Sequence, residues 1–117
     1  MATKTGRIQH GQFKDYHSVT IHGWMMTRLG LTGNKLLIYA TVFQYSSMGN
    51  SEFSGGEDTL SALTNISVDS VNKILKQLSS ERLILVNELE FKGRKHHTYR
   101  ANLRKVYAAL NTKKTQE

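Results

Sequence analysis

The sequence predicts a mainly α-helical domain that carries one β-hairpin. Apolar residues recur at three- and four-residue steps through most of the chain, whereas a β-favouring run with partial alternation follows residue 82. A length of 117 residues with 38% hydrophobic content suits one domain with a single modest core. The chain has no cysteine, which excludes disulfides and thiolate metal sites and fits a reducing cytosol.

Three parts are expected along the chain. Residues 1–15 are polar and basic with no sustained period, which predicts a flexible arm. Residues 16–102 should form the folded domain, and residues 103–117 a C-terminal helix with a basic tail. No apolar run approaches the ~20 residues of a membrane span, and no secretory segment follows Met1. We therefore expect a cytoplasmic protein that contacts no membrane.

The N-terminal half predicts a lead-in and two helices. The segment 16–21 alternates and is rich in β-branched residues, so we expect a short strand or an extended lead-in. In 21–29, apolar residues at helical spacing stop at Gly30, which suits a left-handed cap. Thr32 should cap the helix over 33–47, which is apolar around most of its circumference and is therefore the expected centre of the core.

The stretch 54–80 predicts two helices joined by a tight turn. Ser54 with Glu57 three residues later is the pattern of a capping box, so a short helix should begin at Ser54. An apolar stripe follows, and the polar pair Thr64-Asn65 should end this first helix. Just before it, Phe53 is expected to enter the apolar interior.

The second helix of this pair is strongly amphipathic. Ser67 is its expected N-cap, and from Val68 onward apolar residues recur at three- and four-residue steps, so one face should be buried. Two helices at a steep angle are a helix-turn-helix motif, whose second helix fits the major groove of DNA. The same pattern also occurs in small helical domains without that role. The opposite, polar face carries Asp69, Ser70, Asn72, Lys73, Lys76 and Gln77.

After this motif the period changes to that of a β-hairpin. Residues 83–89 favour a strand, and residues 96–101 alternate again. The predicted tip between them, Lys92-Gly93-Arg94-Lys95, is strongly basic. A helix-turn-helix followed by a hairpin with a cationic tip is a winged helix-turn-helix, in which the helix reads bases and the wing contacts flanking phosphates.

A last helix is expected after Asn102, which can cap it. Leu103, Val106, Tyr107 and Leu110 would form an apolar stripe along one side. This stripe either packs back on the N-terminal helices or pairs with a second copy of the chain. A homodimer through the C-terminal or N-terminal helices is therefore one expected state.

The net charge of +7 is unevenly distributed. Residues 1–51 hold five Lys and Arg against one carboxylate, and residues 52–90 hold seven carboxylates against three Lys and Arg. Residues 91–116 hold eight Lys and Arg and no carboxylate. Concentrated positive charge favours a polyanionic partner, which means nucleic acid or an acidic membrane surface. A basic, solvated tail without a partner is the simpler alternative.

Four motifs in this chain carry a resemblance to a known family. They are the tryptophan-bearing helix with its Leu-Gly-Leu-x-Gly link in WMMTRLGLTGNKLLIYATV, the Phe-x-Gly start of FSGGEDTLSALTNIS, and the Ser-x-x-Ser-Val start of the helix in SVDSVNKILKQLSSERLI. From about residue 16 to 102 the chain resembles the winged helix-turn-helix domains of bacterial, phage and plasmid replication initiators, replisome organisers and small transcriptional regulators. The resemblance implies sequence-specific binding of double-stranded DNA.

The resemblance also implies which residues bind. It assigns the recognition helix contacts to Ser67, Asp69, Ser70, Lys73 and Gln77, and the wing contacts to residues 92–97, including His97. With the charge pattern, we expect base contacts from Ser70, Asn72, Lys73 and Gln77, and phosphate contacts from Lys76, Lys92, Arg94, Lys95 and Arg100. Asp69 departs from relatives that carry Arg or Lys there, because a carboxylate repels phosphate and suits a cytosine amino group or its own helix N-terminus.

Other functions are less well supported by the residues. His96 and His97 are adjacent on a strand and point to opposite faces, so they cannot share one metal ion, and we expect no metal or cofactor. Gly55-Gly56 lacks the Gly-Lys-Ser/Thr ending of a P-loop, and no nucleophile motif is present, so we expect no enzyme. The alternative is a winged-helix module that docks on proteins of a replication or mobile-element complex, which would suit Asp69.

Overall fold

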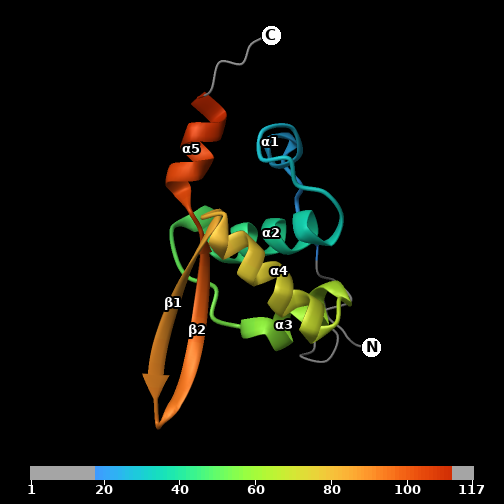
Figure 1. Cartoon of the computed structure of the whole chain (residues 1–117). Coiled ribbons are helices and arrows are strands. Elements are labelled where there is room, and N and C mark those ends of the chain that lie inside the picture. The colour runs from blue at the N-terminus through green and yellow to red at the C-terminus, as the bar shows by residue number, and fades with distance from the viewer. Residues whose placement is uncertain (1–17, 112–117) are drawn as a thin grey trace, which may run out of the picture.

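The computed structural model describes residues 18–111, so the arm expected at 1–15 and the end of the helix and basic tail expected at 103–117 lie outside these residues (Figure 1). The described part is mainly helical with one two-stranded antiparallel sheet, which confirms the predicted α+β, winged-helix-like class. Its elements are α1 (Gly23–Thr27), α2 (Gly33–Tyr45), the short 3₁₀ helix η2 (Ser47–Gly49), α3 (Gly56–Thr64), α4 (Val68–Ser80), β1 (Ile84–Phe91), β2 (Arg94–Ala101) and α5 (Leu103–Asn111).

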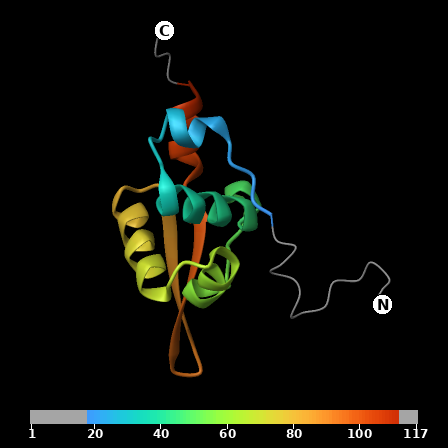
Figure 2. The ribbon, with the colours of Figure 1, turned by 90° about the vertical axis from the view of Figure 1, so that its right-hand side faces the viewer.

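The core is built around α2, as predicted. Every residue of α2 from Ile38 to Phe43 is buried, because α3, α4 and β2 all pack on this helix (Figure 2). Trp24 of α1 lies edge-on to the rings of Tyr39 and Phe43, with centroid distances of 6.2 and 5.3 Å. Helix α2 therefore carries the other helices and the base of the hairpin.

The N-terminal lead-in is extended, and its described residues form no strand. Gln44 of α2 takes the place of a pairing strand: its Oε1 accepts from Thr20 N at 2.9 Å, and its Nε2 donates to the Ser18 carbonyl at 2.7 Å. Helix α1 has five residues, shorter than the predicted 21–29 segment, and Gly30 adopts the left-handed conformation with φ 70°. The side-chain amide of Gln44 thus satisfies the backbone N–H of Thr20 and the backbone carbonyl of Ser18.

The caps expected at Thr32, Ser54 and Ser67 have different outcomes. Ser67 Oγ accepts from Ser70 N at 3.2 Å, so the predicted cap of α4 is confirmed. Thr32 stands at the N-cap of α2 without a side-chain bond. The capping box at Ser54 is wrong: α3 begins at Gly56, its N-cap is Gly55, and no side chain caps it.

The hairpin is longer and tighter than predicted. Strands β1 and β2 pair in register from Ile84 opposite Ala101 to Phe91 opposite Arg94, so Arg94 and Lys95 lie in a strand and the turn is Lys92-Gly93 alone. Both turn residues have positive φ, 55° and 76°, the geometry that favours two-residue hairpin turns. The predicted four-residue basic tip is therefore corrected to a two-residue turn with cationic strand residues beside it.

The base of the hairpin is anchored by Phe53, which is buried as expected. Its N–H donates to the Tyr99 carbonyl at 2.7 Å, and Tyr99 N–H donates back at 2.9 Å. Through this single bridge, the segment before α3 pairs with the outer edge of β2.

Helix α5 begins as predicted, with Asn102 Oδ1 accepting from Arg104 N at 3.2 Å. Arg28 beyond α1 donates to the Ala109 carbonyl at 2.7 Å, which holds α5 beside α1 (Figure 1). Of the predicted stripe, Val106 is buried, whereas Tyr107 and Leu110 are 58% and 47% exposed. The stripe thus packs back only in part. In residues 18–111 no helix is long and apolar enough to cross a membrane.

Candidate nucleic-acid interface

Helix α4 exposes one polar face because its apolar residues pack into the core. Val71, Leu75 and Leu78 are buried. Val68, which the periodicity placed with them, is 42% exposed, because the first turn of α4 extends beyond the core. On the outer side, the predicted contact residues Asp69, Ser70, Lys73, Lys76 and Gln77 are exposed and Asn72 is half-buried.

Three predicted contact residues, Ser67, Asp69 and Ser70, lie at the start of α4. Besides accepting from the backbone of Ser70, the Ser67 hydroxyl lies 3.0 Å from the Ser70 hydroxyl. Asp69 lies in the same turn, where a carboxylate is favoured by the helix dipole. Ser67, Asp69 and Ser70 therefore stabilise the start of the helix, and free donors for a ligand begin at Asn72 and Lys73.

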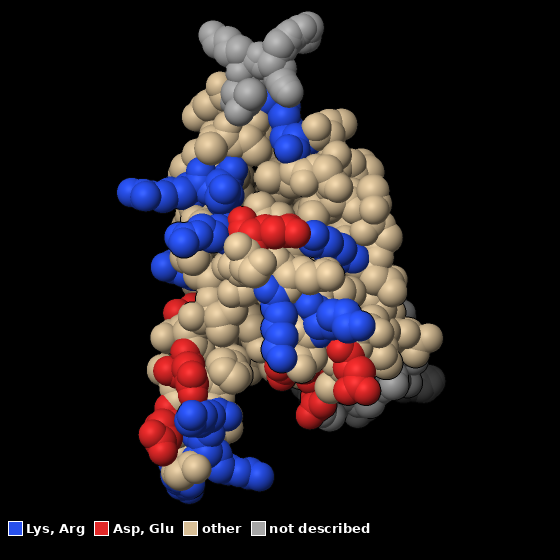
Figure 3. All heavy atoms as spheres, in the orientation of Figure 1, with Lys and Arg blue, Asp and Glu red and all other residues tan. Residues whose placement is uncertain are grey.

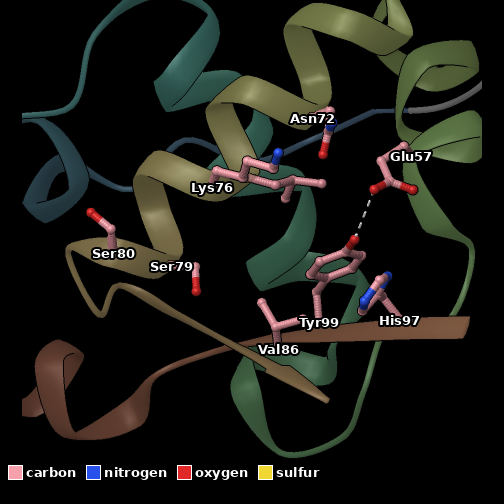
Figure 4. Close-up of a pocket in the computed structure, with 9 residues that line it drawn as sticks. Glu57, Asn72, Lys76, Ser79, Ser80, Val86, His97 and Tyr99 are labelled. Carbon is pink, nitrogen blue, oxygen red and sulfur yellow. Dashed lines mark hydrogen bonds between the residues drawn. The ribbon is translucent and has the colours of Figure 1, made fainter. Parts of the chain in front are cut away.

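A hollow of about 320 Å³ lies between α4 and the hairpin (Figure 4). It brings together three predicted contact residues that are far apart in sequence: Asn72 and Lys76 from α4, and His97 from β2. Figure 4 shows Asn72 and Lys76 on α4 at one side of the hollow, and Val86, His97 and Tyr99 on the strands at the other. The remaining lining comes from Glu57, Leu75, Ser79, Ser80, Val86 and Tyr99.

Tyr99 and Glu57 form the floor of this hollow, and neither was predicted as part of the site. The phenolic O–H of Tyr99 donates to Glu57 Oε2 at 3.3 Å. Burial raises the pKa of Tyr99 well above its usual value, and the charge of Glu57 and the hydrogen bond add to the rise. The His97 ring lies against the same phenol, with a centroid distance of 6.4 Å. Tyr99 thus remains a neutral donor at all ordinary pH values.

The hairpin register mixes charges that the sequence separates. Glu88 lies opposite His97 and Glu90 opposite Lys95, so carboxylates of the acidic segment stand among cations of the basic segment. Lys95 Nζ lies 3.3 Å from Glu88 Oε2, with both side chains largely exposed. The wing is therefore less cationic than residues 91–116 alone indicate, and Lys95 is partly neutralised.

The remaining wing cations lie elsewhere on the hairpin. Lys92 is in the turn with its ammonium 5.4 Å from the Phe91 ring centroid, and Arg94 opens β2. Arg100 lies on the opposite face from His97, beside Leu103 and Arg104 in a separate hollow. Figure 3 shows Lys and Arg side chains over α4 and over the hairpin on one face, with Asp and Glu side chains among them.

His96 and His97 are consecutive residues of β2. His96 pairs with Leu89 and His97 with Glu88, and consecutive strand residues face opposite sides. Among residues 18–111, no cluster of three or more metal-ligating side chains occurs.

Sequence reasoning missed Glu57, Tyr99 and Val86 because their position depends on packing. Glu57 was assigned to a helix cap, and Tyr99 was read only as a strand former. The period-two spacing of His97 and Tyr99 was the available signal, since it puts both side chains on one face of the strand.

No protein-family model matches the sequence, and no curated protein matches it. Among solved structures, the chain is similar to Stf76 from the Sulfolobus islandicus plasmid-virus pSSVx. The sequence identity is 20%, the match covers 72% of this chain and 99% of that chain, and the TM-score is 0.44. At this level of similarity, neither the fold nor the function of this chain is drawn from Stf76.

Proposed function

We propose that this chain binds double-stranded DNA sequence-specifically and acts as a transcriptional or replication regulator. In this proposal α4 enters the major groove, and the hairpin contacts the adjacent sugar-phosphate backbone. Association with the nucleoid would follow from such binding.

The observation that carries the proposal is the shared hollow of Asn72, Lys76 and His97. Residues from a helix with a free polar face and from a neighbouring wing line one concave surface of about 320 Å³. A phosphate strand that crosses this surface would meet the Lys76 ammonium from one side and His97 from the other. Asn72 offers the donor and acceptor pair that suits adenine.

The proposed roles follow from where each side chain lies. Asn72, Lys73 and Gln77 are the candidates for base edges, since they follow the capped first turn of α4. Lys76, Lys92, Arg94, Lys95 and Arg100 are the candidates for phosphates. Ser67, Asp69 and Ser70 would act by holding the helix start, and Ser70 would reach a base only by giving up its bond to Ser67.

Fluorescence anisotropy tests the proposal. The wild-type chain is titrated with random double-stranded DNA and with single-stranded RNA across a salt series. We expect salt-sensitive duplex binding that is lost when Lys92, Arg94 and Lys95 are changed to Ala together. Lys105→Ala is the matched control, because it removes a cation from the exposed side of α5. Absence of duplex binding at low salt would refute the proposal.

A protein-docking module is the competing function, and the exposed part of α5 is the observation that favours it. Tyr107 and Leu110 leave apolar surface open beside α1, where Met26 is 46% exposed. A second copy of this chain is the occupant we expect, since two-fold dimers are the commonest homo-oligomers. Light scattering of the wild type and of Leu110→Lys distinguishes a homodimer from a monomer. If the chain forms a homodimer through this surface, the wild type should have the mass of a dimer, and the mass of the variant should fall towards that of a monomer.

A further inference from the structure

One face of β1 exposes apolar side chains that increase in exposure towards the turn. Leu85 is 39% exposed, Leu89 is 47% exposed and Phe91 is 62% exposed. They share a face because strand residues two apart point to the same side. An aromatic ring this exposed has no role in the core, and it stands at the far end of the hairpin (Figure 1).

Basic residues lie opposite these apolar residues across the sheet, two of them arginines. Arg100 lies opposite Leu85, His96 opposite Leu89, and Arg94 opposite Phe91. The Lys92 ammonium lies over the Phe91 ring at 5.4 Å. The surface around Phe91 is therefore both apolar and positive, and it suits a partner that is apolar and anionic together. The DNA minor groove is such a partner, since sugar and base edges lie between two rows of phosphates.

Phe91 is exposed at the end of β1, beside the turn. Lys92 and Gly93 close the hairpin in two residues, so Phe91 is the last residue of β1 and lies directly before the turn. A narrow end with one large apolar side chain resembles the wedges by which minor-groove proteins partly unstack a base step and kink the duplex.

We propose that Phe91 inserts from the minor groove at a base step flanking the site read by α4, and that it bends the DNA there. This inference rests on the proposed duplex binding and adds a deformation to it. Lys92 and Arg94 would neutralise the phosphates on either side of the opened step. Flexible pyrimidine–purine steps should be preferred at this position, because they unstack at least cost.

The test uses a short duplex recovered from a random pool by the wild-type chain. One arm places 2-aminopurine at successive positions and records fluorescence, which rises where a base is unstacked. A second arm labels the duplex ends and records energy transfer as a measure of bending. Both are repeated with Phe91→Ala, with Phe91→Leu, which keeps a smaller apolar wedge, and with Leu89→Ala, which removes an apolar side chain from the same face.

We expect a fluorescence increase at one step and increased end-to-end transfer with the wild type. Phe91→Ala should lose both while its duplex affinity falls by about tenfold or less, the scale of one lost contact. Phe91→Leu should keep part of the signal, and Leu89→Ala most of it. Duplex binding without unstacking or bending, or bending that survives in Phe91→Ala, overturns the wedge and leaves the proposed function standing. No duplex binding at all overturns both.

Discussion

The phenolic oxygen of Tyr99 donates a hydrogen bond to Glu57 Oε2 at 3.3 Å and so joins the second strand of the hairpin to the first turn of α3. The same residue exchanges two backbone hydrogen bonds with Phe53. Tyr99 thus links β2 to α3 through its side chain and to the segment just before α3 through its backbone. The position of the wing relative to α4, and with it the hollow between them, depends on this residue.

Two tyrosine-to-phenylalanine changes should differ in their effect on stability. Tyr99→Phe removes a hydrogen bond and should lower the free energy of unfolding by about 1 kcal/mol. The Tyr39 hydroxyl is buried and has no hydrogen-bond partner in the described part of the chain, so Tyr39→Phe removes an unsatisfied group and should be neutral or stabilising. Denaturant unfolding measures both. A loss in Tyr39→Phe equal to that in Tyr99→Phe would contradict this account.

Both tyrosines predict that the fold weakens in alkali. Burial raises the pKa of Tyr39 and of Tyr99 above the value of about 10 that an unfolded chain has. The unfolded chain therefore releases these protons first, so their contribution is complete below pH ~10 and is lost as the pH rises towards the folded-state values. Tyr39→Phe should reduce the slope of unfolding free energy against pH above 10 by about 1.4 kcal/mol per pH unit. An unchanged slope would argue against a buried Tyr39.

Three substitutions to alanine, each of which removes a side-chain hydroxyl, test which hydroxyls cap a helix. Ser67→Ala should cost about 1 kcal/mol, because the Ser67 hydroxyl caps α4, and this should lower Tm by about 4–8 °C. Thr32→Ala is the matched control at an N-cap position without a side-chain bond. Ser54→Ala tests the rejected capping box and should likewise change Tm little. If Ser54→Ala is as costly as Ser67→Ala, the capping box forms in solution.

Removal of the ion pair between Lys95 and Glu88 should raise the affinity for DNA. Glu88→Gln frees Lys95 from a carboxylate 3.3 Å away and removes one negative charge. If the hairpin lies along phosphates, duplex affinity should rise by up to about fivefold at low salt, the scale of an exposed charge pair. Lys95→Gln should weaken binding by a similar factor. Anisotropy at two salt concentrations tests this, and a rise that persists at high salt would point to a cause other than charge.

The helix and the wing should differ in what they contribute to binding. Lys73→Ala should cost about 1–3 kcal/mol at the preferred site and relax specificity, because Lys73 lies on the exposed face of α4. Arg94→Ala should weaken all duplexes alike. With about six phosphate contacts the log–log salt slope is near −5, and losing one contact should change it by about 0.9. Equal effects of both variants on specificity would refute the assignment.

Strong local patterns predicted the helices well. The three- and four-residue steps from Val68 onward, with Ser67 before them, matched α4 and its cap. The near-continuous apolar character of 33–47 predicted a central helix, and Ile38 to Phe43 are all buried. These predictions succeeded because helix periodicity and capping depend on residues only a few positions apart.

Predictions that needed a distant partner were less accurate. Glu57 sits three residues after Ser54, as a capping box requires, yet its carboxylate accepts a hydrogen bond from Tyr99, 42 residues away. The basic run after residue 90 was separated from the acidic run in sequence, but antiparallel pairing set Lys95 beside Glu88. Lys92-Gly93 was part of the predicted turn, and only the strand register showed that the turn contains no more than these two residues.

The helix periods, the Ser67 cap, the presence of a hairpin and the polar face of α4 follow from local sequence patterns, because short-range backbone and burial preferences suffice for each. Only the folded chain shows which residues meet in the hollow of Asn72, Lys76 and His97, how far charges on the wing cancel, and that Phe91 stands exposed beside the turn. These features depend on strand register and on the packing of β2 against α2 and α3, which are set by contacts between segments far apart in the chain.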